Sequence, residues 1–209
     1  MIKSLIHTSV QSDINFPSLP KEQTIKTILK SLHVHLLQFE KSFLLEGLLI
    51  QQEDDISRKL ALYLDDKMEN LLVQCDAKKG ADFIIYVKPF VLSADPIFLM
   101  EAKRLPPTNN KDYVQGSTGG IERFKREQQG YGKHLMKSAM IGYIQQHSKA
   151  QWLEKVNTWV DEMIKKDTDL NWNKNDKLVA DKEVADFISQ HERVTQSLLT
   201  LYHFWLLLY

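Results

Sequence analysis

A chain of 209 residues, 43% of them hydrophobic, is long enough to bury the core of one domain of ordinary size. Its 27 Lys and Arg residues balance 27 Asp and Glu residues, and this zero net charge excludes a general attraction of the whole chain to nucleic acid or acidic membranes. The single cysteine, Cys75, excludes an internal disulfide and, without a Cys/His cluster, a structural zinc site, which fits a reducing, cytoplasmic compartment.

The N-terminal part, residues 1–44, is predicted to be a helical lead-in. Apolar residues recur there at intervals of three and four, which predicts a helix from residue 21 to about residue 40. His33 and His35 lie two residues apart and therefore on different helical faces. We interpret them as surface or partly packed histidines and not as joint metal ligands.

A second amphipathic helix is predicted within residues 51–72, and three acidic residues, Glu53, Asp54 and Asp55, occupy its first turn. The partial positive charge of a helix N-terminus stabilises acidic side chains there, and this accounts for all three. The alternative is that Glu53 turns towards the strands that follow and contributes to a metal site. The residues alone favour the first explanation and leave the second open.

The chain is organised around a predicted β-hairpin within residues 80–104. Two runs rich in β-branched and aromatic residues, 82–87 and 96–101, flank a loop over residues 88–95 that contains Ser, Asp and Pro. Residues 71–73 form a further short strand ahead of them. This order predicts an antiparallel hairpin preceded by a third strand.

Pairing of the two hairpin strands places Asp82 opposite Glu101, and alternation along the second strand puts Glu101 and Lys103 on one face. Paired carboxylates repel each other unless a cation lies between them, and carboxylate oxygens suit Mg²⁺. A lysine beside that metal can orient an attacking water or stabilise charge on a phosphate. The three residues therefore suit phosphodiester hydrolysis, although a charged hairpin without chemistry meets so short a pattern as well.

The composition of the chain changes after the hairpin. Residues 106–120 are rich in Pro, Asn and Gly, and long loops of this kind are often functional, so a lid or a substrate-contacting loop is expected. A helix is predicted from residue 121, followed by a buried strand over residues 139–144. The predicted helix carries the basic residues Arg123, Lys125, Arg126, Lys133 and Lys137. They either bind phosphates at the site or solvate an amphipathic helix.

The C-terminal part, residues 146–209, is predicted to contain a helix from residue 148 and closing strands. An aromatic and apolar stripe at helical spacing in that helix is interpreted as core. Residues 165–182 are rich in Asp, Asn and Lys and predict a surface loop. The apolar end, residues 198–209, is shorter than the ~20 residues that a membrane-spanning helix needs, so no membrane segment is expected. Strands are favoured there over a buried helix.

This order of elements predicts an α/β (α+β) fold with a central mixed sheet flanked by helices. We expect a single domain over residues 1–209. Residues 45–145 would form its catalytic core, between the N-terminal lead-in and the C-terminal helix and strands.

Three pieces of the sequence resemble the PD-(D/E)xK, restriction-endonuclease-like, nuclease superfamily. They are Glu53 at a helix start, Ala81-Asp82 ahead of the first hairpin strand, and Glu101-Ala102-Lys103 at the end of the second. The segments GGIERF and MIGYI, with Tyr131 between them, and the C-terminal end are similar to uncharacterised bacterial members, some of them linked to restriction or anti-phage loci. The resemblance implies a restriction-endonuclease-like αβββαβ core.

The resemblance also implies roles for these residues. Asp82 and Glu101 would ligate Mg²⁺ or Mn²⁺ with the Ala102 carbonyl, and Glu53 would be a further acidic ligand, directly or through water. Lys103 would position the water or stabilise the transition state.

On the substrate side, the resemblance implies that Arg123 holds a phosphate, with Gln128 and Tyr131 as further candidates. The residues alone do not distinguish Gln128 from Gln129.

The function implied is a metal-dependent endonuclease that acts on DNA in bacterial defence or restriction. The neutral net charge favours a partner protein such as an ATPase or helicase, and a homodimer is one option. One alternative is a catalytically inactive nuclease-fold subunit of a defence complex, with the aromatic C-terminus as its interface. Another is a nuclease for RNA or single strands.

Overall fold

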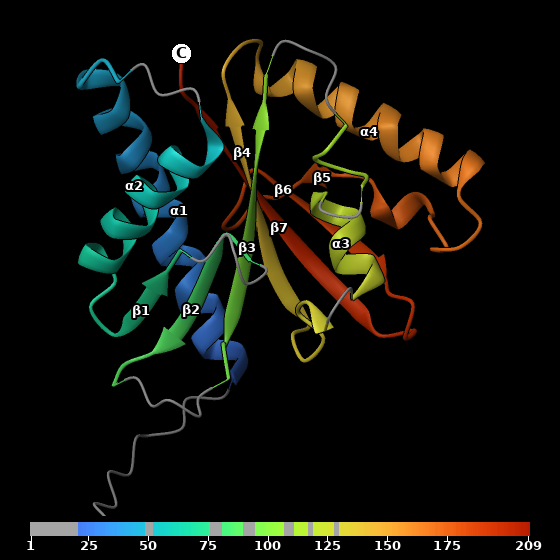
Figure 1. Cartoon of the computed structure of the whole chain (residues 1–209), viewed down its shortest axis with the longest axis horizontal. Helices are drawn as coiled ribbons and strands as arrows, with labels where there is room; N and C mark the ends of the chain where they lie inside the picture. Colours follow the sequence, from blue (N-terminus) through green and yellow to red (C-terminus); the bar gives the residue numbers. More distant parts are fainter. Residues whose placement is uncertain are drawn as a thin grey trace, which may run out of the picture.

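The computed structural model describes residues 21–48, 52–75, 81–89, 95–106, 111–116, 119–127 and 130–209. Within them the strands form one seven-stranded sheet in the order β1-β2-β3-β4-β7-β6-β5 (Figure 1). The strands are β1 (Leu71–Gln74), β2 (Phe83–Val87), β3 (Phe98–Leu105), β4 (Lys137–Ile144), β5 (Val179–Ala180), β6 (Phe187–Glu192) and β7 (Leu198–Leu207). The helices are α1 (Lys21–Leu45), α2 (Glu53–Lys67), α3 (Gly120–Arg126) and α4 (Lys149–Lys166), and a 3-10 turn, η2 (Lys174–Asp176), precedes β5.

Strand direction changes across the sheet. β1, β2 and β3 are antiparallel neighbours, β3, β4 and β7 run parallel, and β7, β6 and β5 are antiparallel again. Parallel neighbours need a crossover connection, and the segment with α3 supplies the one between β3 and β4. The prediction of an α+β fold with a mixed sheet flanked by helices is confirmed.

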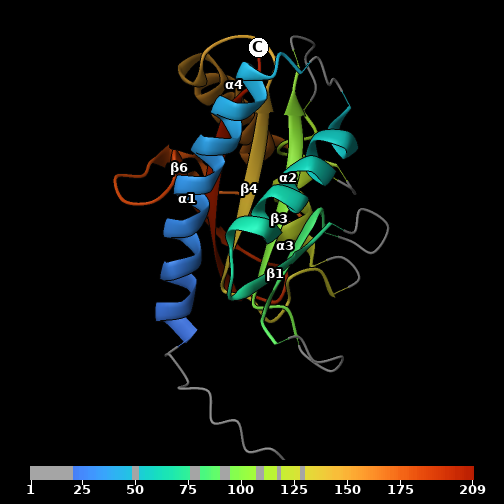
Figure 2. The ribbon, with the colours of Figure 1, turned by 90° about the vertical axis from the view of Figure 1, so that its left-hand side faces the viewer.

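Helices cover both faces of the sheet. Figure 1 shows α1 and α2 on one side and α3 and α4 on the other, and Figure 2 shows α1 running along its face with α2 beside it. Side chains alternate along the central strand β4, so Ile141 and Tyr143 pack in the core under α1 and α2, whereas Met140 and Ile144 pack in the opposite core. None of the helices in the described ranges combines the length and apolarity needed to cross a membrane.

The predicted helix from residue 121 is too long. α3 ends at Arg126, because Glu127 adopts a left-handed backbone with φ of 47° and ends the helix. Of the basic residues assigned to that helix, Lys133 lies in a turn and Lys137 begins β4. The predicted strand over residues 139–144 is confirmed within β4.

The preference for strand over helix at the C-terminal end is confirmed, although residues 198–209 hold the single strand β7, which pairs with β6. β7 lies inside the sheet between β4 and β6, and Trp205 is fully buried, so the aromatic end is core and not an interface. The predicted surface loop over residues 165–182 is wrong at Asp176, which is fully buried. A buried carboxylate requires partners, and those partners belong to a second polar cluster described below.

Candidate active site

The candidate site lies where β2 and β3 part. Their antiparallel ladder runs as far as the pair of Phe83 with Met100, and one further step in this register sets Asp82 opposite Glu101. The predicted register of the hairpin is therefore confirmed, with Asp82 one residue before the paired part of β2. The hairpin brings both carboxylates to the same end of the sheet.

Beyond the first residue of β2, two carboxylates accept hydrogen bonds from backbone amides of β3. The amide N–H of Ala102 donates to Oδ2 of Asp82 over 2.7 Å, and the amide N–H of Arg104 donates to Oε2 of Glu53 over 2.7 Å. The N–H and C=O of one strand residue point to the same edge, so the Ala102 carbonyl faces the side of Asp82 as well. Asp82 and Glu53 are thus fixed by the backbone of β3.

Glu101 is buried at the centre of the site, with 1% of its surface exposed. Its Oε1 accepts from Nζ of Lys103 at 2.9 Å and from Nη1 of Arg123 at 3.2 Å, and its Oε2 accepts from the Tyr131 hydroxyl at 2.6 Å. Burial, and then the Glu101 charge, raise the pKa of Tyr131 well above its usual value, so its hydroxyl stays a donor. These donors offset the cost of burying the carboxylate.

Lys103 lies between two carboxylates, with Nζ 2.9 Å from Oε1 of Glu101 and 3.3 Å from Oε1 of Glu53. Burial lowers the pKa of Lys103, but the charges of Glu101, Glu53 and Asp82 outweigh burial, and the pKa is raised above its ordinary value. Lys103 is therefore cationic at neutral pH. It can orient water or stabilise negative charge, but it has no free electron pair to act as a general base.

Asp82 holds its proton unusually well. Burial, and then the neighbouring charge of Glu101, raise the pKa of Asp82 to about 7, whereas Lys103 and the Ala102 amide act in the opposite direction. The acidic charge around Asp82 is thus not fully balanced by Lys103. A divalent cation between Asp82 and Glu101 would supply the missing positive charge and displace the proton.

In metal-free buffer we expect Asp82 to lower the free energy of unfolding as the pH rises from about 4 through about 7. The folded chain keeps a proton on Asp82 that the unfolded chain releases, so this contribution to stability is present at low pH and lost through the folded pKa. Asp82→Asn removes this loss. In denaturant unfolding, the free energy of unfolding of the variant minus that of the wild type should be about 1–4 kcal/mol larger at about pH 8 than at about pH 5. A difference that is independent of pH would contradict the raised pKa.

Glu53 faces the hairpin. The helix-dipole explanation, which the residues alone favoured, does not account for its contacts with the Lys103 ammonium and the Arg104 amide. Asp54 and Asp55 are exposed in the first turn of α2, where that explanation still holds. The alternative left open for Glu53, a place at the site, is the one that its geometry fits.

Arg123 reaches the site from α3, and its guanidinium lies 4.3 Å from the centre of the Tyr131 ring. Lys125 is instead fully buried against Asp176, and Arg126 is engaged by acidic neighbours. Of these cations Arg123 lines the cleft, whereas Lys125 fits neither phosphate binding nor solvation of the helix. Gln128, predicted on the substrate side, lies outside the described residues.

An open cleft of about 680 Å³ borders these side chains. Among the described residues that line it, six are acidic and four are basic. They are Gln52, Glu53, Asp54, Asp55, Arg58, Asp82, Glu101, Lys103, Arg104, Asp112 and Arg123. Sequence reasoning did not single out Arg58, Arg104 or Asp112, although Asp112 lies in the loop expected to be functional. The acidic excess favours a bound cation before any polyanion.

The donor set at the cleft fits a hard divalent cation. Carboxylate oxygens of Asp82 and Glu101 and the carbonyl of Ala102 are ligands that Mg²⁺ and Mn²⁺ accept, with water in the remaining positions. Among the residues that the structure describes, no three His, Cys, Asp or Glu side chains gather as a ready metal-binding group. The Lys103 ammonium contacts both Glu53 and Glu101, so a further ligand role for Glu53 stays a prediction.

No model of a protein family, no curated protein and no solved structure matches this chain. The function is therefore inferred from the geometry and electrostatics of the cleft.

Proposed function

We propose that this chain is a metal-dependent nuclease that hydrolyses phosphodiester bonds in DNA. The observation that carries the proposal is Asp82 opposite Glu101 with Lys103 at their side, in a site that raises the pKa of Asp82 to about 7. Asp82 and Glu101 offer carboxylate oxygens to a divalent cation, and a fixed ammonium beside it stabilises the negative charge that develops on an attacked phosphate.

The order of elements supports the proposal. From α2 to β4 the chain runs helix, three strands, helix and strand, which is the αβββαβ order of a restriction-endonuclease-like core. Glu53 begins the helix, Asp82 precedes the second strand, and Glu101 and Lys103 lie in the third strand. These are the positions that the PD-(D/E)xK resemblance implies.

In this proposal Asp82, Glu101 and the Ala102 carbonyl hold Mg²⁺ or Mn²⁺. The cation, when bound, polarises the phosphate and lowers the pKa of a coordinated water. Lys103 stays protonated and stabilises the extra charge on the phosphate, and the backbone amides that bind Asp82 and Glu53 keep these carboxylates in place. Arg123 lines the cleft from α3 and would hold a phosphate oxygen.

A partner that delivers the DNA follows from the charge of the chain and the cleft. The chain has no net charge, and the cleft has more acidic than basic residues, so duplex DNA gains little from electrostatic attraction alone. A cytoplasmic ATPase or helicase of a bacterial defence system is the partner that the resemblance suggests. A homodimer is the other way to extend the binding surface.

A catalytically inactive scaffold is the second candidate function. Both oxygens of Glu101 already accept hydrogen bonds from Lys103, Arg123 and Tyr131, so this carboxylate has cationic partners other than a metal. In that case calorimetric titration with Mn²⁺ should show no binding that depends on Asp82 and Glu101.

We expect the purified chain to cleave double-stranded DNA with Mg²⁺ or Mn²⁺. Asp82→Ala and Lys103→Ala should each slow cleavage at least about a hundredfold, because one weakens cation binding and the other removes charge stabilisation. Asp66→Ala is the matched control, since this exposed carboxylate at the far end of α2 pairs only with Lys67 among the ion pairs of the described residues. Parallel assays with single-stranded DNA and RNA establish the substrate. Cleavage that survives both site substitutions would refute the assignment.

A further inference from the structure

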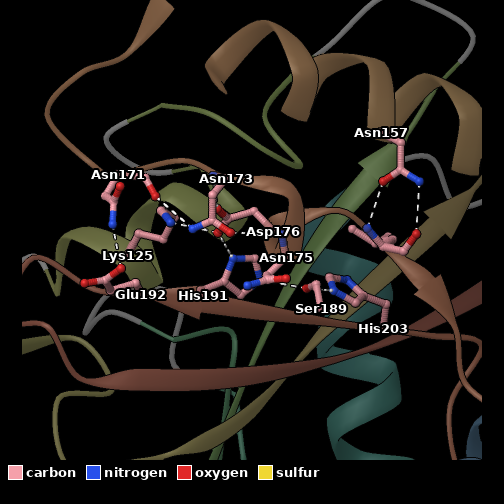
Figure 3. A network of polar contacts seen from close by, with 11 residues as sticks. Lys125, Asn157, Asn171, Asn173, Asn175, Asp176, Ser189, His191, Glu192 and His203 are labelled. Carbon is pink, nitrogen blue, oxygen red and sulfur yellow. Dashed lines mark hydrogen bonds and ion pairs between the residues drawn. The ribbon is translucent and has the colours of Figure 1, made fainter. Parts of the chain in front are cut away.

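Six buried polar side chains, here called the buried chain, connect α3 with the sheet: Lys125, Asp176, His191, Ser189, His203 and Tyr113. Figure 3 labels the first five. Each member is at most 2% exposed. Nζ of Lys125 lies 2.7 Å from Oδ1 of Asp176, which lies 2.5 Å from Nδ1 of His191. Nε2 of His191 lies 2.6 Å from Oγ of Ser189, which lies 2.7 Å from Nε2 of His203.

The buried chain ends at an aromatic hydroxyl. Nδ1 of His203 lies 2.8 Å from the hydroxyl of Tyr113, and Nε1–H of Trp205 donates to that hydroxyl over 2.9 Å. Ser189 and His191 on β6, and His203 on β7, occupy alternate strand positions that face the core with Phe187, Leu201 and Trp205. This alternation of polar residues within an apolar face is the sequence signal that could have revealed them.

Donor and acceptor capacities allow one direction along the buried chain. The Asp176 carboxylate only accepts, so Nδ1–H of His191 donates to it and Nε2 of His191 accepts from the Ser189 hydroxyl. Ser189 in turn accepts from Nε2–H of His203, whose Nδ1 accepts from the Tyr113 hydroxyl. Burial lowers the pKa of both histidines, which keeps them neutral, and neutral rings are what this order requires. Protonation of either ring would leave one hydroxyl hydrogen without an acceptor.

Ser189, His191 and Asp176 have the composition of a hydrolytic triad, but the buried chain is closed to substrate. Ser189 is 2% exposed, and its hydroxyl is held between two imidazoles. A nucleophile must reach its substrate, so hydrolysis by this serine is excluded in this conformation.

The two ends of the buried chain hold the two ends of α3. At one end, Lys125 belongs to the last turn of α3. At the other, Tyr113 belongs to a segment whose carbonyls cap the first turn, since the carbonyls of Asp112, Tyr113 and Val114 accept from the amides of residues 120, 121 and 122 over 2.8–3.2 Å. α3 has seven residues and no side-chain N-cap, and a helix that short is not stable alone.

We propose that the buried chain is a positioning device for the candidate site, because it fixes α3 at both ends and so sets Arg123 against Glu101. The role of Arg123 towards substrate rests on the proposed function. The placement of α3 does not. Ser189 is the central link, and it acts on the site only through the residues that it connects.

Ser189→Ala tests this proposal. Loss of the hydroxyl leaves Nε2 of both histidines without a partner, so amide hydrogen exchange in residues 111–116 and 119–127 should accelerate at least about tenfold relative to α2. Ser189→Thr, which keeps a hydroxyl, should restore most of the protection.

Two matched controls separate local from global effects. Ser138→Ala removes a hydroxyl that is also fully buried but has no hydrogen-bond partner within the described part of the chain, and it should leave exchange unchanged. Leu32→Ala opens a cavity in the core on the opposite face of the sheet and should destabilise the chain. Its exchange should not accelerate specifically in residues 111–116 and 119–127. Acceleration that is uniform in Ser189→Ala would overturn the proposal.

Cleavage kinetics give the second readout. Ser189→Ala should lower kcat at least about tenfold without weakening Mn²⁺ binding, because Arg123 moves while Asp82 and Glu101 keep their positions on the sheet. Selective exchange with unchanged kcat would show that the buried chain stabilises α3 without positioning Arg123, and would also overturn the proposal. If the wild-type chain cleaves no nucleic acid, the proposed function fails, and the exchange experiment alone decides whether the buried chain places α3.

Discussion

Lys103→Met is expected to bind Mn²⁺ at least about tenfold more tightly than the wild-type chain while cleaving DNA at least about a hundredfold more slowly. The two effects have opposite signs because the Lys103 ammonium competes with a cation for Glu101 and Asp82 but stabilises the charge of an attacked phosphate. Calorimetric titration measures the first effect, and single-turnover cleavage at saturating Mn²⁺ measures the second.

The metal-free stability of Lys103→Met provides an independent check. Without the ammonium, Glu53, Asp82 and Glu101 repel one another, and among the described residues Arg123 is the one cation left close to Glu101. The variant should therefore unfold more easily in EDTA and recover when Mn²⁺ is added. Lys67→Met, at an exposed ion pair of α2, is the matched control and should change neither property. Weaker Mn²⁺ binding by Lys103→Met would show that Lys103 organises the carboxylates instead of competing with the metal.

The geometry of the hairpin was predictable because its determinants are local. Alternation has a period of two, so the register that buries Phe83, Ile85 and Met100 also sets Asp82 opposite Glu101. A slip of one residue would expose these apolar side chains, and hydrophobic burial therefore fixes the acidic pair as well. The helices α1 and α4 follow from periodicity in the same way.

The contacts of Glu53 and Lys125 were not predictable from local pattern. The first turn of α2 explains an acidic residue by the helix dipole, and only the tertiary position of α2 next to β3 turns Glu53 towards Lys103. Lys125 appeared as one cation of a solvated or phosphate-binding helix, but its partner Asp176 lies 51 residues later in a stretch whose composition indicates a surface loop. Single-sequence patterns carry no information on such long-range pairs.

The Lys125–Asp176 pair should give a large stability effect, because both partners are fully buried. We expect Lys125→Met to lower the free energy of unfolding by about 3–5 kcal/mol at about pH 8, because it leaves the buried Asp176 carboxylate without a cation. Lys177→Met is the control, since Lys177 pairs with Asp161 at a partly exposed site and should cost at most about 1 kcal/mol.

The pH dependence of that loss shows whether a bound proton replaces the ammonium. In the wild type, burial lowers the pKa of His191, with Lys125 and Arg193 acting in the same direction and Asp176 opposing them. Without Lys125 the Asp176 charge dominates, so the folded pKa of His191 rises, and the added stability is present below the ordinary histidine pKa and lost as the pH rises through the folded value. Denaturant unfolding should therefore show a smaller loss at about pH 5.5 than at about pH 8. Recovery stays incomplete, because a protonated His191 turns Nε2–H against the Ser189 hydroxyl and breaks the order of the buried chain. An equal loss at both pH values would mean that His191 stays neutral and Asp176 stays ionised in the folded variant, because uptake of a proton by either group would make the loss smaller at the lower pH.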